Sequence, residues 1–381
     1  MSRNTLKNEW DKDWVLDDHI IHLNHAAVAP WPLRTKHAIN AFVQENISIG
    51  SQNYLQWYVI ETQLRQRLSQ LINAPSVDDI ALLKNTSEGL SVIAYGLNWS
   101  AGDNIVISNE EFPSNRIVWE SLVDKFGVEV RYADLKEHET PEDALISCCD
   151  KRTKLLSISS VQYASGIRMN LSRLGDFCNE RDILFCVDAI QSLGALAFDL
   201  DEVNADFVVA DAHKWMLGPE GIALFYVREK IRDRLNLNQY GWHMVEKMGD
   251  FSVQDWQVAQ SARRFECGSP NSLGIHAFNA SLSLILETGM NKIEAAIKER
   301  VQYMKGLIEE KPMLECISDC NESRMSGILC FKTTSQDQES LYKYLQSEGV
   351  LCALRGGGIR FSPHYYTPFE KIKQAIDLAA K

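Results

Sequence analysis

Between residues 79 and 227 the chain alternates short apolar runs with stretches whose apolar residues recur at helical spacing. Short apolar runs rich in β-branched residues are typical of buried strands, and the stretches between them are typical of covering helices. The alternation predicts an α/β domain with a mainly parallel sheet. Its seven strands are expected at residues 79–83, 104–109, 128–135, 153–161, 183–189, 206–212 and 221–227.

The helices expected at residues 86–97 and 114–127 open with Thr or Ser, which are common residues at the start of a helix. The last two strands, 206–212 and 221–227, are joined by a segment too short to hold a crossover helix. Parallel strands need such a crossover, so we expect this last pair to be antiparallel.

The C-terminal third follows a different pattern. A long helical stretch at residues 271–310, interrupted by one glycine, precedes strand-like runs at 326–333 and 349–355 and a closing amphipathic helix at 368–381. We therefore expect a large domain at residues 18–270 and a smaller α+β domain at 271–381, which residues 1–17 join.

Composition narrows the class of protein. The chain has 381 residues, of which 45% are hydrophobic and 24% charged, as in ordinary soluble globular proteins. A net charge of −12 repels phosphate backbones and anionic lipids. No apolar run approaches the roughly 20 residues that span a bilayer, and the first twenty residues lack the apolar core of a signal peptide. We expect neither nucleic-acid nor membrane partners.

The nine cysteines are scattered without a CxxC pair. In a chain of this length they predict reduced thiols and a cytoplasmic location. The spacing of Cys316 and Cys320 has no further cysteine or histidine nearby, so we interpret it as two ordinary thiols and predict no metal site. The sequence also lacks GxGxxG, GxxxxGK[ST], HExxH and GxSxG, which argues against dinucleotide, nucleotide-triphosphate, zinc-protease and serine-hydrolase sites.

Polar residues stand instead at the carboxyl ends of apolar strands, where open α/β sheets bind ligands. Asp188 ends one such strand and Lys214 follows the next, one crossover unit later. Asp188 could alternatively cap a following helix, and Lys214 could be a surface lysine. Thr86 and Ser87 begin a helix after a strand, where free N–H groups and hydroxyls suit a phosphate, although capping is the commoner use.

Together these three features match pyridoxal 5′-phosphate. A carboxylate keeps the pyridine nitrogen protonated, a lysine of lowered basicity binds the aldehyde as a Schiff base, and the start of a helix holds the phosphate. Few other cofactors use all three groups.

The same residues lie in motifs that resemble the class V aminotransferase family of pyridoxal-phosphate enzymes. This family includes cysteine desulfurases, selenocysteine lyases, kynureninases and isopenicillin N epimerases. The resemblance covers residues 22–366, and its motifs occur in the family's order: NTSEG, EEFPSN, VDAIQSLG, ADAHKWMLGPEG, RRFECGSPN and GIRFSP. It implies the fold of type I pyridoxal-phosphate enzymes and a homodimer with shared active sites.

The resemblance also implies roles for individual residues. Lys214 corresponds to the Schiff-base lysine, Asp188 to the partner of the pyridinium nitrogen, and His213 to the residue before the lysine. These three are the catalytic residues that the resemblance implies. Phe112 corresponds to the aromatic residue that stacks on the cofactor ring. The remaining cofactor contacts implied by the resemblance are Thr86, Ser87, Gln191, Asp211 at a position that is commonly Ser, and Ser269, which reaches the phosphate of the neighbouring subunit.

On the substrate side, Arg360 resembles the arginine that binds the carboxylate of a small amino acid. Its alternative role is a surface salt bridge. Asn24 and His25 resemble the segment that closes over the substrate, although His25 could equally be a loop histidine.

One departure from the desulfurases is informative. Their catalytic cysteine lies on a loop shortly before this arginine, whereas this chain has only RGGG at residues 355–358. Cys352 is the nearest cysteine and is expected to pack in a strand.

We therefore predict an enzyme that acts at the α-carbon of an amino acid. Aminotransferase activity ranks first, and elimination by a C–S lyase and epimerisation are the alternatives. A protein of another class, which binds ligand in this fold without turnover, is opposed by the presence of Lys214, Asp188 and Arg360.

Overall fold

The computed structural model describes residues 11–252 and 254–381. The seven predicted strands form one sheet in the order β2-β8-β7-β6-β5-β3-β4. This confirms the predicted α/β fold. The strands are β2 (Ile80–Leu83), β3 (Asn104–Ser108), β4 (Glu129–Ala133), β5 (Thr153–Ser159), β6 (Leu184–Asp188), β7 (Phe207–Asp211) and β8 (Ala223–Val227).

Strand β8 runs against both of its neighbours, β2 and β7, and the other pairs in the sheet are parallel. The antiparallel pairing of β7 and β8 confirms the expectation from their short connection. Because all strands except β8 point the same way, β5, β6 and β7 end at the same edge of the sheet as β2. The polar residues at the ends of these strands therefore lie along the same edge of the sheet.

Helices cover both faces of the sheet over two apolar cores. Those that follow the strands are α3 (Thr86–Gly96), α4 (Ser114–Glu120), α5 (Val123–Phe126), α6 (Pro141–Ser147), α7 (Leu171–Glu180), α8 (Leu200–Val203) and α9 (Glu229–Arg232). The single helix predicted at 114–127 is thus two. Between α4 and α5 the hydroxyl of Ser121 donates to the backbone carbonyl of Val118. This side-chain hydrogen bond competes with the backbone hydrogen bonds that would continue the helix.

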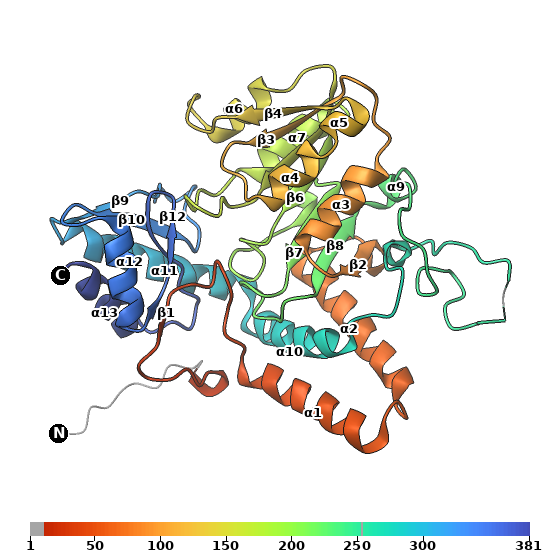
Figure 1. Cartoon of the computed structure of the whole chain (residues 1–381), viewed down its shortest axis with the longest axis horizontal. Helices are drawn as coiled ribbons and strands as arrows, with labels where there is room; N and C mark the ends of the chain where they lie inside the picture. The colour runs from red at the N-terminus through yellow and green to blue at the C-terminus, as the bar shows by residue number, and fades with distance from the viewer. Residues whose placement is uncertain (1–10, 253) are drawn as a thin grey trace.

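Two long helices, α1 (Leu33–Ile49) and α2 (Tyr54–Ile72), precede the sheet and were not predicted. They form a hairpin at the lower edge of Figure 1, packed against α10 (Ser272–Thr288). Gly289, whose φ of 87° is left-handed, separates α10 from α11 (Met290–Glu309), as the glycine interruption predicts. Short 3₁₀ helices lie at Asp11–Asp13, Val77–Asp79 and Ala262–Phe265.

The C-terminal part, blue in Figure 1, contains a four-stranded sheet in the order β12-β13-β10-β9. The predicted strand at 349–355 is divided at Cys352. The elements are β9 (Leu314–Cys316), β10 (Leu329–Thr333), α12 (Gln338–Ser347), β11 (Val350–Leu351), β12 (Ala353–Arg355), β13 (Gly358–Phe361) and α13 (Phe369–Ala379).

An N-terminal strand, β1 (Ile21–His22), pairs with β11 of this C-terminal part. The predicted domain boundaries place residues 21–22 in the large domain, so the chain crosses between the two parts near its start. The division at residue 270 stays a prediction, and residues 1–10 of the predicted joining segment lie outside the described residues. Within the described part of the chain, every helix is too short or too polar to cross a bilayer.

Candidate active site

A cavity of about 290 Å³ lies where the ends of β5, β6 and β7 face the C-terminal sheet. Nine of the residues predicted for the site line it, brought together from five segments of the chain. Its full lining is Ala26, Ala27, Thr86, Ser87, Phe112, Ser114, Ser159, Tyr163, Asp188, Ile190, Gln191, Asp211, His213, Lys214, Arg355 and Arg360.

Lys214 lies in the turn after β7, with its side chain in the cavity wall. Removal from water lowers the pKa of Lys214 to about 8, and the nearby Arg360 lowers it further while Asp188 opposes the shift. The ammonium nitrogen lies 5.7 Å from the centroid of the Phe112 ring. A lysine in this state has a substantial neutral fraction near pH 8, which is the form that adds to an aldehyde.

Asp188 is the last residue of β6, and it is buried. Its carboxylate accepts hydrogen bonds from the side chain of Asn115 at 2.6 Å and from the backbone N–H of Ile190 at 2.9 Å. Burial raises its pKa above the ordinary value for aspartate. No helix begins directly after Asp188, so the capping alternative does not apply. The carboxylate is oriented and, among the described residues, has no cation bonded to it, which leaves it available to a pyridinium nitrogen.

The start of α3 carries the predicted phosphate contacts. Its N-cap is Asn85, whose side chain accepts from the N–H of Glu88 at 2.8 Å. Thr86 is therefore not the cap, and its buried Oγ1 has no hydrogen-bond partner among the described residues. The hydroxyl of Ser87 donates to that of Ser114 at 2.9 Å.

Asp211, the last residue of β7, faces this helix start. Its carboxylate accepts the backbone N–H of Thr86 at 3.1 Å. Burial and the neighbouring Asp188 raise the pKa of Asp211 to about 7. The Asp211 carboxyl group is thus hydrogen-bonded to one of the backbone N–H groups that the start of a helix can donate to an anion.

Arg360 lies on β13, with 3% of its surface exposed. Its guanidinium donates to the carbonyl of Tyr163 at 2.6 Å and reaches the side-chain oxygen of Asn24 at 3.5 Å. Burial, together with Arg355, lowers the pKa of Arg360 to about 10, and its Nε has no hydrogen-bond partner among the described residues. A buried guanidinium that contacts only neutral oxygens is suited to an anionic ligand.

These features fit pyridoxal 5′-phosphate. Thr86 Oγ1 and Arg360 Nε are buried polar atoms without hydrogen-bond partners among the described residues, and both residues line the cavity together with Lys214 and Asp188. Buried polar groups without partners are costly and rare in folded proteins. Such atoms suggest that a ligand with a phosphate at one end and a carboxylate at the other would complete the site.

His213 and Gln191 line the cavity as predicted, and the Gln191 side chain is already hydrogen-bonded. His213 Nδ1 lies 3.7 Å from Asp211, and burial lowers the pKa of His213 to about 4, so the ring is neutral near pH 7. Gln191 donates to the carbonyl of Ala26 at 3.0 Å and accepts from the indole of Trp215 at 2.9 Å. Gln191 therefore ties the N-terminal segment to the lysine loop.

Three predicted residues, Asn24, His25 and Ser269, do not line the cavity, although the side-chain oxygen of Asn24 lies 3.5 Å from the Arg360 guanidinium. His25 is fully buried, and its ring nitrogens contact the carbonyl of Ser362 at 2.9 Å and the hydroxyl of Tyr366 at 2.6 Å. We therefore do not carry His25 into the proposed site. Ser269 is exposed beside a separate cavity next to Gly221 and Phe265. A position outside its own chain's active site is what a contact to a neighbouring subunit requires.

Three residues of the site were not predicted. Asn115 fixes Asp188, Tyr163 contacts both Phe112 and Arg360, and Arg355 lines the cavity beside the glycine triplet. Asn115 ends the quoted EEFPSN motif, and Tyr163 follows β5 at the edge where Asp188 and Asp211 were recognised. A search of all strand ends could therefore have found Tyr163.

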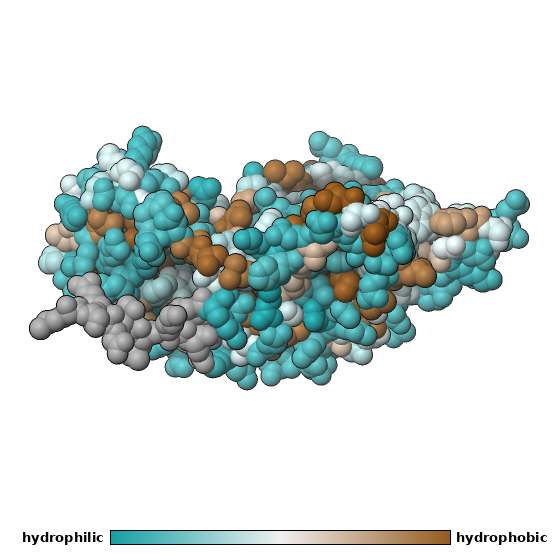
Figure 2. Space-filling view, turned by 90° about the horizontal axis from the view of Figure 1, so that it is seen from below, coloured by the Kyte–Doolittle hydropathy of each residue, from teal (hydrophilic) through white to brown (hydrophobic). Residues whose placement is uncertain are grey.

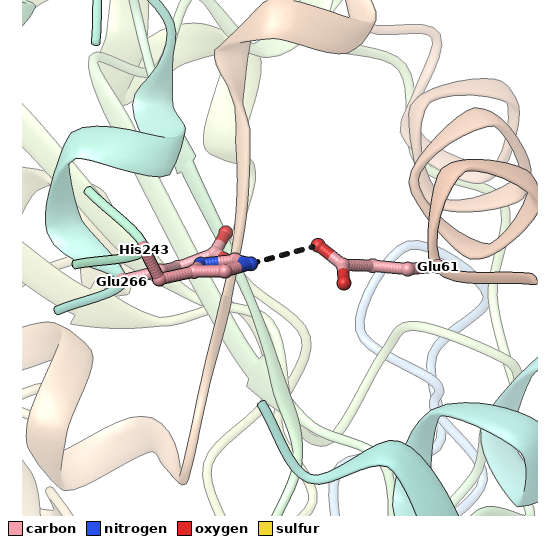
Figure 3. A group of neighbouring side chains, drawn as sticks. All are labelled: Glu61, His243 and Glu266. Atoms are coloured by element: carbon pink, nitrogen blue, oxygen red, sulfur yellow. Dashed lines mark ion pairs between the residues drawn. The ribbon is translucent and has the colours of Figure 1, made fainter. Parts of the chain in front are cut away.

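A second cluster of titratable groups lies away from the cavity (Figure 3). Glu61 of α2, His243 and Glu266 are buried with donor atoms close enough to hold a metal ion. Arg65, however, donates to Glu61 at 2.5 Å and to Glu266 at 2.5 and 2.7 Å. Because this guanidinium already forms hydrogen bonds with both carboxylates, we interpret the four residues as a structural ion-pair network rather than a metal site.

Comparison with known proteins agrees with this geometry. The model of the family "Aminotransferase class-V" matches residues 21–373. A probable cysteine desulfurase from Methanothermobacter thermautotrophicus is 27% identical, over 94% of this chain and 93% of the relative. The solved structure of the cystine C–S lyase C-DES with cysteine persulfide aligns with a TM-score of 0.87 at 21% identity, over 95% of this chain and 97% of that one.

A C-DES mutant with glycine covalently linked to its pyridoxal-phosphate cofactor aligns with a TM-score of 0.86 at 21% identity. The alignment covers 96% of this chain and 100% of that chain. At these identities the two structures establish a shared fold, namely that of type I pyridoxal-phosphate enzymes with a smaller C-terminal part.

Proposed function

The chain belongs to the class V aminotransferase family of pyridoxal-phosphate enzymes, and from that premise we propose that it is a lyase that cleaves a C–S bond of a sulfur-containing amino acid. The observation that carries the proposal is the pairing, in one cavity, of the half-buried amine of Lys214 with the buried guanidinium of Arg360. The relatives named as desulfurases and as a C–S lyase favour this reaction over transamination.

The cavity favours direct elimination over a cysteine-based desulfurase mechanism. Among the described residues, none of those lining it is a cysteine. Strands β12 and β13 are joined by the two-residue turn Gly356–Gly357, whose φ angles of 61° and 80° are readily adopted by glycine. Cys352 is buried, and burial raises the pKa of its thiol to about 12. A turn of this length leaves no loop to carry a thiol to the substrate.

When bound, pyridoxal phosphate supplies an electron sink that allows a bond at the α-carbon of an amino acid to break heterolytically. Arg360 binds the substrate carboxylate and so sets which α-carbon bond faces Lys214. The neutral amine of Lys214 takes the proton from the α-carbon. Asp188, oriented by Asn115, holds a proton on the ring nitrogen opposite it.

Phe112 and the start of α3 complete the proposed binding of the cofactor. The Phe112 ring, in edge contact with Tyr163 at 5.2 Å, provides the aromatic face against which the cofactor ring stacks. Thr86 and Ser87 bind the phosphate through the helix start and their hydroxyls. His213, Gln191 and Asp211 line the rest of the ring's surroundings.

We propose a homodimer as the functional unit. Exposed apolar side chains lie on the α1–α2 hairpin, namely Val43, Ile47, Ile49, Leu55 and Val59. Hydrophobic residues, brown in Figure 2, also reach the surface in several places on the face seen there. Contiguous exposed apolar residues often mark protein interfaces. A second copy of this chain bound there would bring Ser269 to the partner's cofactor phosphate. The nine unpaired cysteines support a reducing, cytoplasmic location.

The test is a product assay with the purified enzyme and added pyridoxal phosphate on cysteine, cystine and alanine. A C–S lyase releases pyruvate and ammonia from the sulfur amino acids and leaves alanine unchanged. Alanine as a product of cysteine would identify a desulfurase. A requirement for an added keto acid would identify an aminotransferase, the reaction ranked first from the sequence, and inverted stereochemistry would identify an epimerase.

The matched variants are Lys214→Ala and Lys343→Ala, the latter an exposed lysine on α12. Lys214→Ala should lose turnover and the visible absorbance of the covalently held cofactor, and Lys343→Ala should keep both. Turnover or cofactor absorbance that survives Lys214→Ala would contradict the proposed role of the lysine.

A further inference from the structure

Two cysteines lie side by side at the edge of the C-terminal sheet, and neither lines the active-site cavity. Cys316 is the last residue of β9, and Cys320 follows four residues later. Their sulfur atoms are 3.8 Å apart, and both side chains are partly exposed. A disulfide bond brings two sulfurs to about 2.05 Å, so small side-chain rotations suffice to join them.

The segment between the two cysteines is anchored. The hydroxyl of Ser318 donates to the carbonyl of Ser165 at 2.6 Å and accepts the backbone N–H of Cys330 at 2.8 Å. Both thiols point to the carbonyl of Ser318, each at 3.6 Å. This anchoring keeps the two sulfurs facing each other, which favours an intramolecular reaction over reaction with a separate molecule.

The two thiols are not equivalent. A hydrogen bond from Cys320 and the nearby ammonium of Lys305 lower the pKa of Cys316. The same hydrogen bond, together with burial, raises the pKa of Cys320. Burial raises the thiol pKa at other cysteines instead, namely Cys149, Cys178, Cys186, Cys330 and Cys352. Cys316 is therefore the cysteine best prepared to react as a thiolate, with a second thiol within reach.

We propose that Cys316 and Cys320 form a reversible redox site that hydroperoxides oxidise to an intramolecular disulfide. The thiolate of Cys316 attacks the peroxide oxygen, so the O–O bond breaks, a sulfenic acid forms and the alkoxide or hydroxide leaves. The thiol of Cys320 then attacks the sulfenic sulfur, forming the S–S bond, while the sulfenic oxygen leaves with the proton as water. A dithiol reductant reverses the change by thiol–disulfide exchange.

The test treats the full-length, cofactor-loaded protein with a few equivalents of hydrogen peroxide and measures intact mass and peptide maps without reduction. The expected result is the loss of two hydrogen atoms, mapped to a bond between Cys316 and Cys320 and restored by dithiothreitol. A disulfide between other cysteines, or oxidation of Cys316 to a sulfinic acid with Cys320 left as a free thiol, would overturn the proposal.

Single variants test the order of the two steps. In Cys320→Ser, the sulfenic acid at Cys316 should persist long enough for dimedone to label it. In Cys316→Ser, Cys320 should remain unlabelled and no disulfide should form. Cys148→Ser, from the adjacent pair Cys148 and Cys149, is the matched control and should oxidise like the parent protein. Equal dimedone labelling of Cys320 in Cys316→Ser would contradict the assigned roles. Thermal unfolding of each variant shows that it is folded.

Discussion

Arg360 is the residue whose environment is hardest to explain without a ligand. Its guanidinium is buried and contacts a backbone carbonyl and an amide oxygen, with no carboxylate bonded to it among the described residues. A buried cation in such surroundings is usually paired with an anion. The substrate carboxylate supplies that anion in the proposed reaction, so Arg360 should govern substrate binding more than cofactor binding.

We expect Arg360→Met to raise KM for the amino acid about 10- to 100-fold, which is the value of a charge-assisted hydrogen bond, while the cofactor stays bound. Steady-state kinetics and the visible absorbance of the cofactor measure the two effects. Arg168→Met is the control, since Arg168 pairs with Glu294 outside the cavity. An unchanged KM would show that the carboxylate binds elsewhere.

Asp211 predicts a pH dependence of cofactor binding. Its pKa is raised to about 7, so the carboxyl is neutral below that pH and anionic above it. The anion would face the cofactor phosphate at the start of α3 and repel it. We expect the Kd of pyridoxal phosphate to rise about tenfold more in the parent protein than in Asp211→Asn between about pH 6 and about pH 8. Fluorescence titration at each pH measures this difference.

Glu111→Gln is the matched control for Asp211. Glu111 is buried near the site, and its pKa is also raised to about 7, but it bonds to Ser159 and Gln162 rather than to the helix start. This variant should keep the parent pH dependence. If Asp211→Asn kept it as well, the dependence would come from another group. The same pKa shift implies that the contribution of Asp211 to folding stability falls as pH rises from 3.8 to about 7.

At the scale of elements, the ion-pair network of Glu61, Arg65, His243 and Glu266 joins helix α2 to the segment after Ala262–Phe265. Glu266 also accepts the N–H of Leu82 in β2 at 2.8 Å. The network therefore joins four separate segments around one guanidinium. The segment it holds leads directly to Ser269.

Removing the central cation should be strongly destabilising, because two buried carboxylates would lose their partner. We expect Arg65→Met to lower the free energy of unfolding by about 3–5 kcal/mol, measured by urea denaturation. Arg116→Met, which removes a half-exposed pair with Glu120, should lower it by less than about 1 kcal/mol. Similar effects of the two substitutions would mean that the buried network adds no more than a surface pair.

Sequence reasoning located elements according to how completely they are buried. Six strands of the large sheet are largely buried, the edge strand β4 is mostly exposed or half-buried, and all seven were predicted within a few residues of their bounds. Helices α1 and α2 were missed because α1 has no buried apolar residue and α2 carries exposed apolar residues beside its buried leucines, which obscures the helical period. Strand β13 was missed because its four residues follow a glycine triplet and are too few to show an alternation.

The residues of the candidate site could be predicted from the sequence where they end a strand or belong to a family motif. Asp188 and Lys214 were found because they end or follow apolar strands, and Asp211 and Arg360 were found through the family resemblance. His25 stands beside Ala26, which lines the cavity, yet its ring points into a buried network with Ser362 and Tyr366. The direction of a side chain in a loop depends on tertiary contacts from more than 300 residues away, which local sequence does not encode.

At the scale of the whole molecule, the apolar face of the α1–α2 hairpin predicts the assembly. Ile47 and Leu55 are 74% and 79% exposed, which is unfavourable unless another surface covers them. We expect the double variant Ile47→Glu with Leu55→Glu to sediment as a monomer, while the parent protein sediments as a dimer. Val15→Glu, at a position equally exposed outside the hairpin, should remain a dimer. A double variant that stays dimeric would place the interface elsewhere.

The dimer and the cofactor are coupled in this arrangement through Ser269, which lies outside the cavity of its own chain. Ser269→Ala should keep the dimer but raise the Kd of pyridoxal phosphate about 2- to 10-fold, the value of one neutral hydrogen bond. The monomeric double variant should show at least the same loss, because it lacks the partner's Ser269 altogether. Full cofactor affinity in that monomer would mean that each chain binds its cofactor without help, and the reason for a shared active site would disappear.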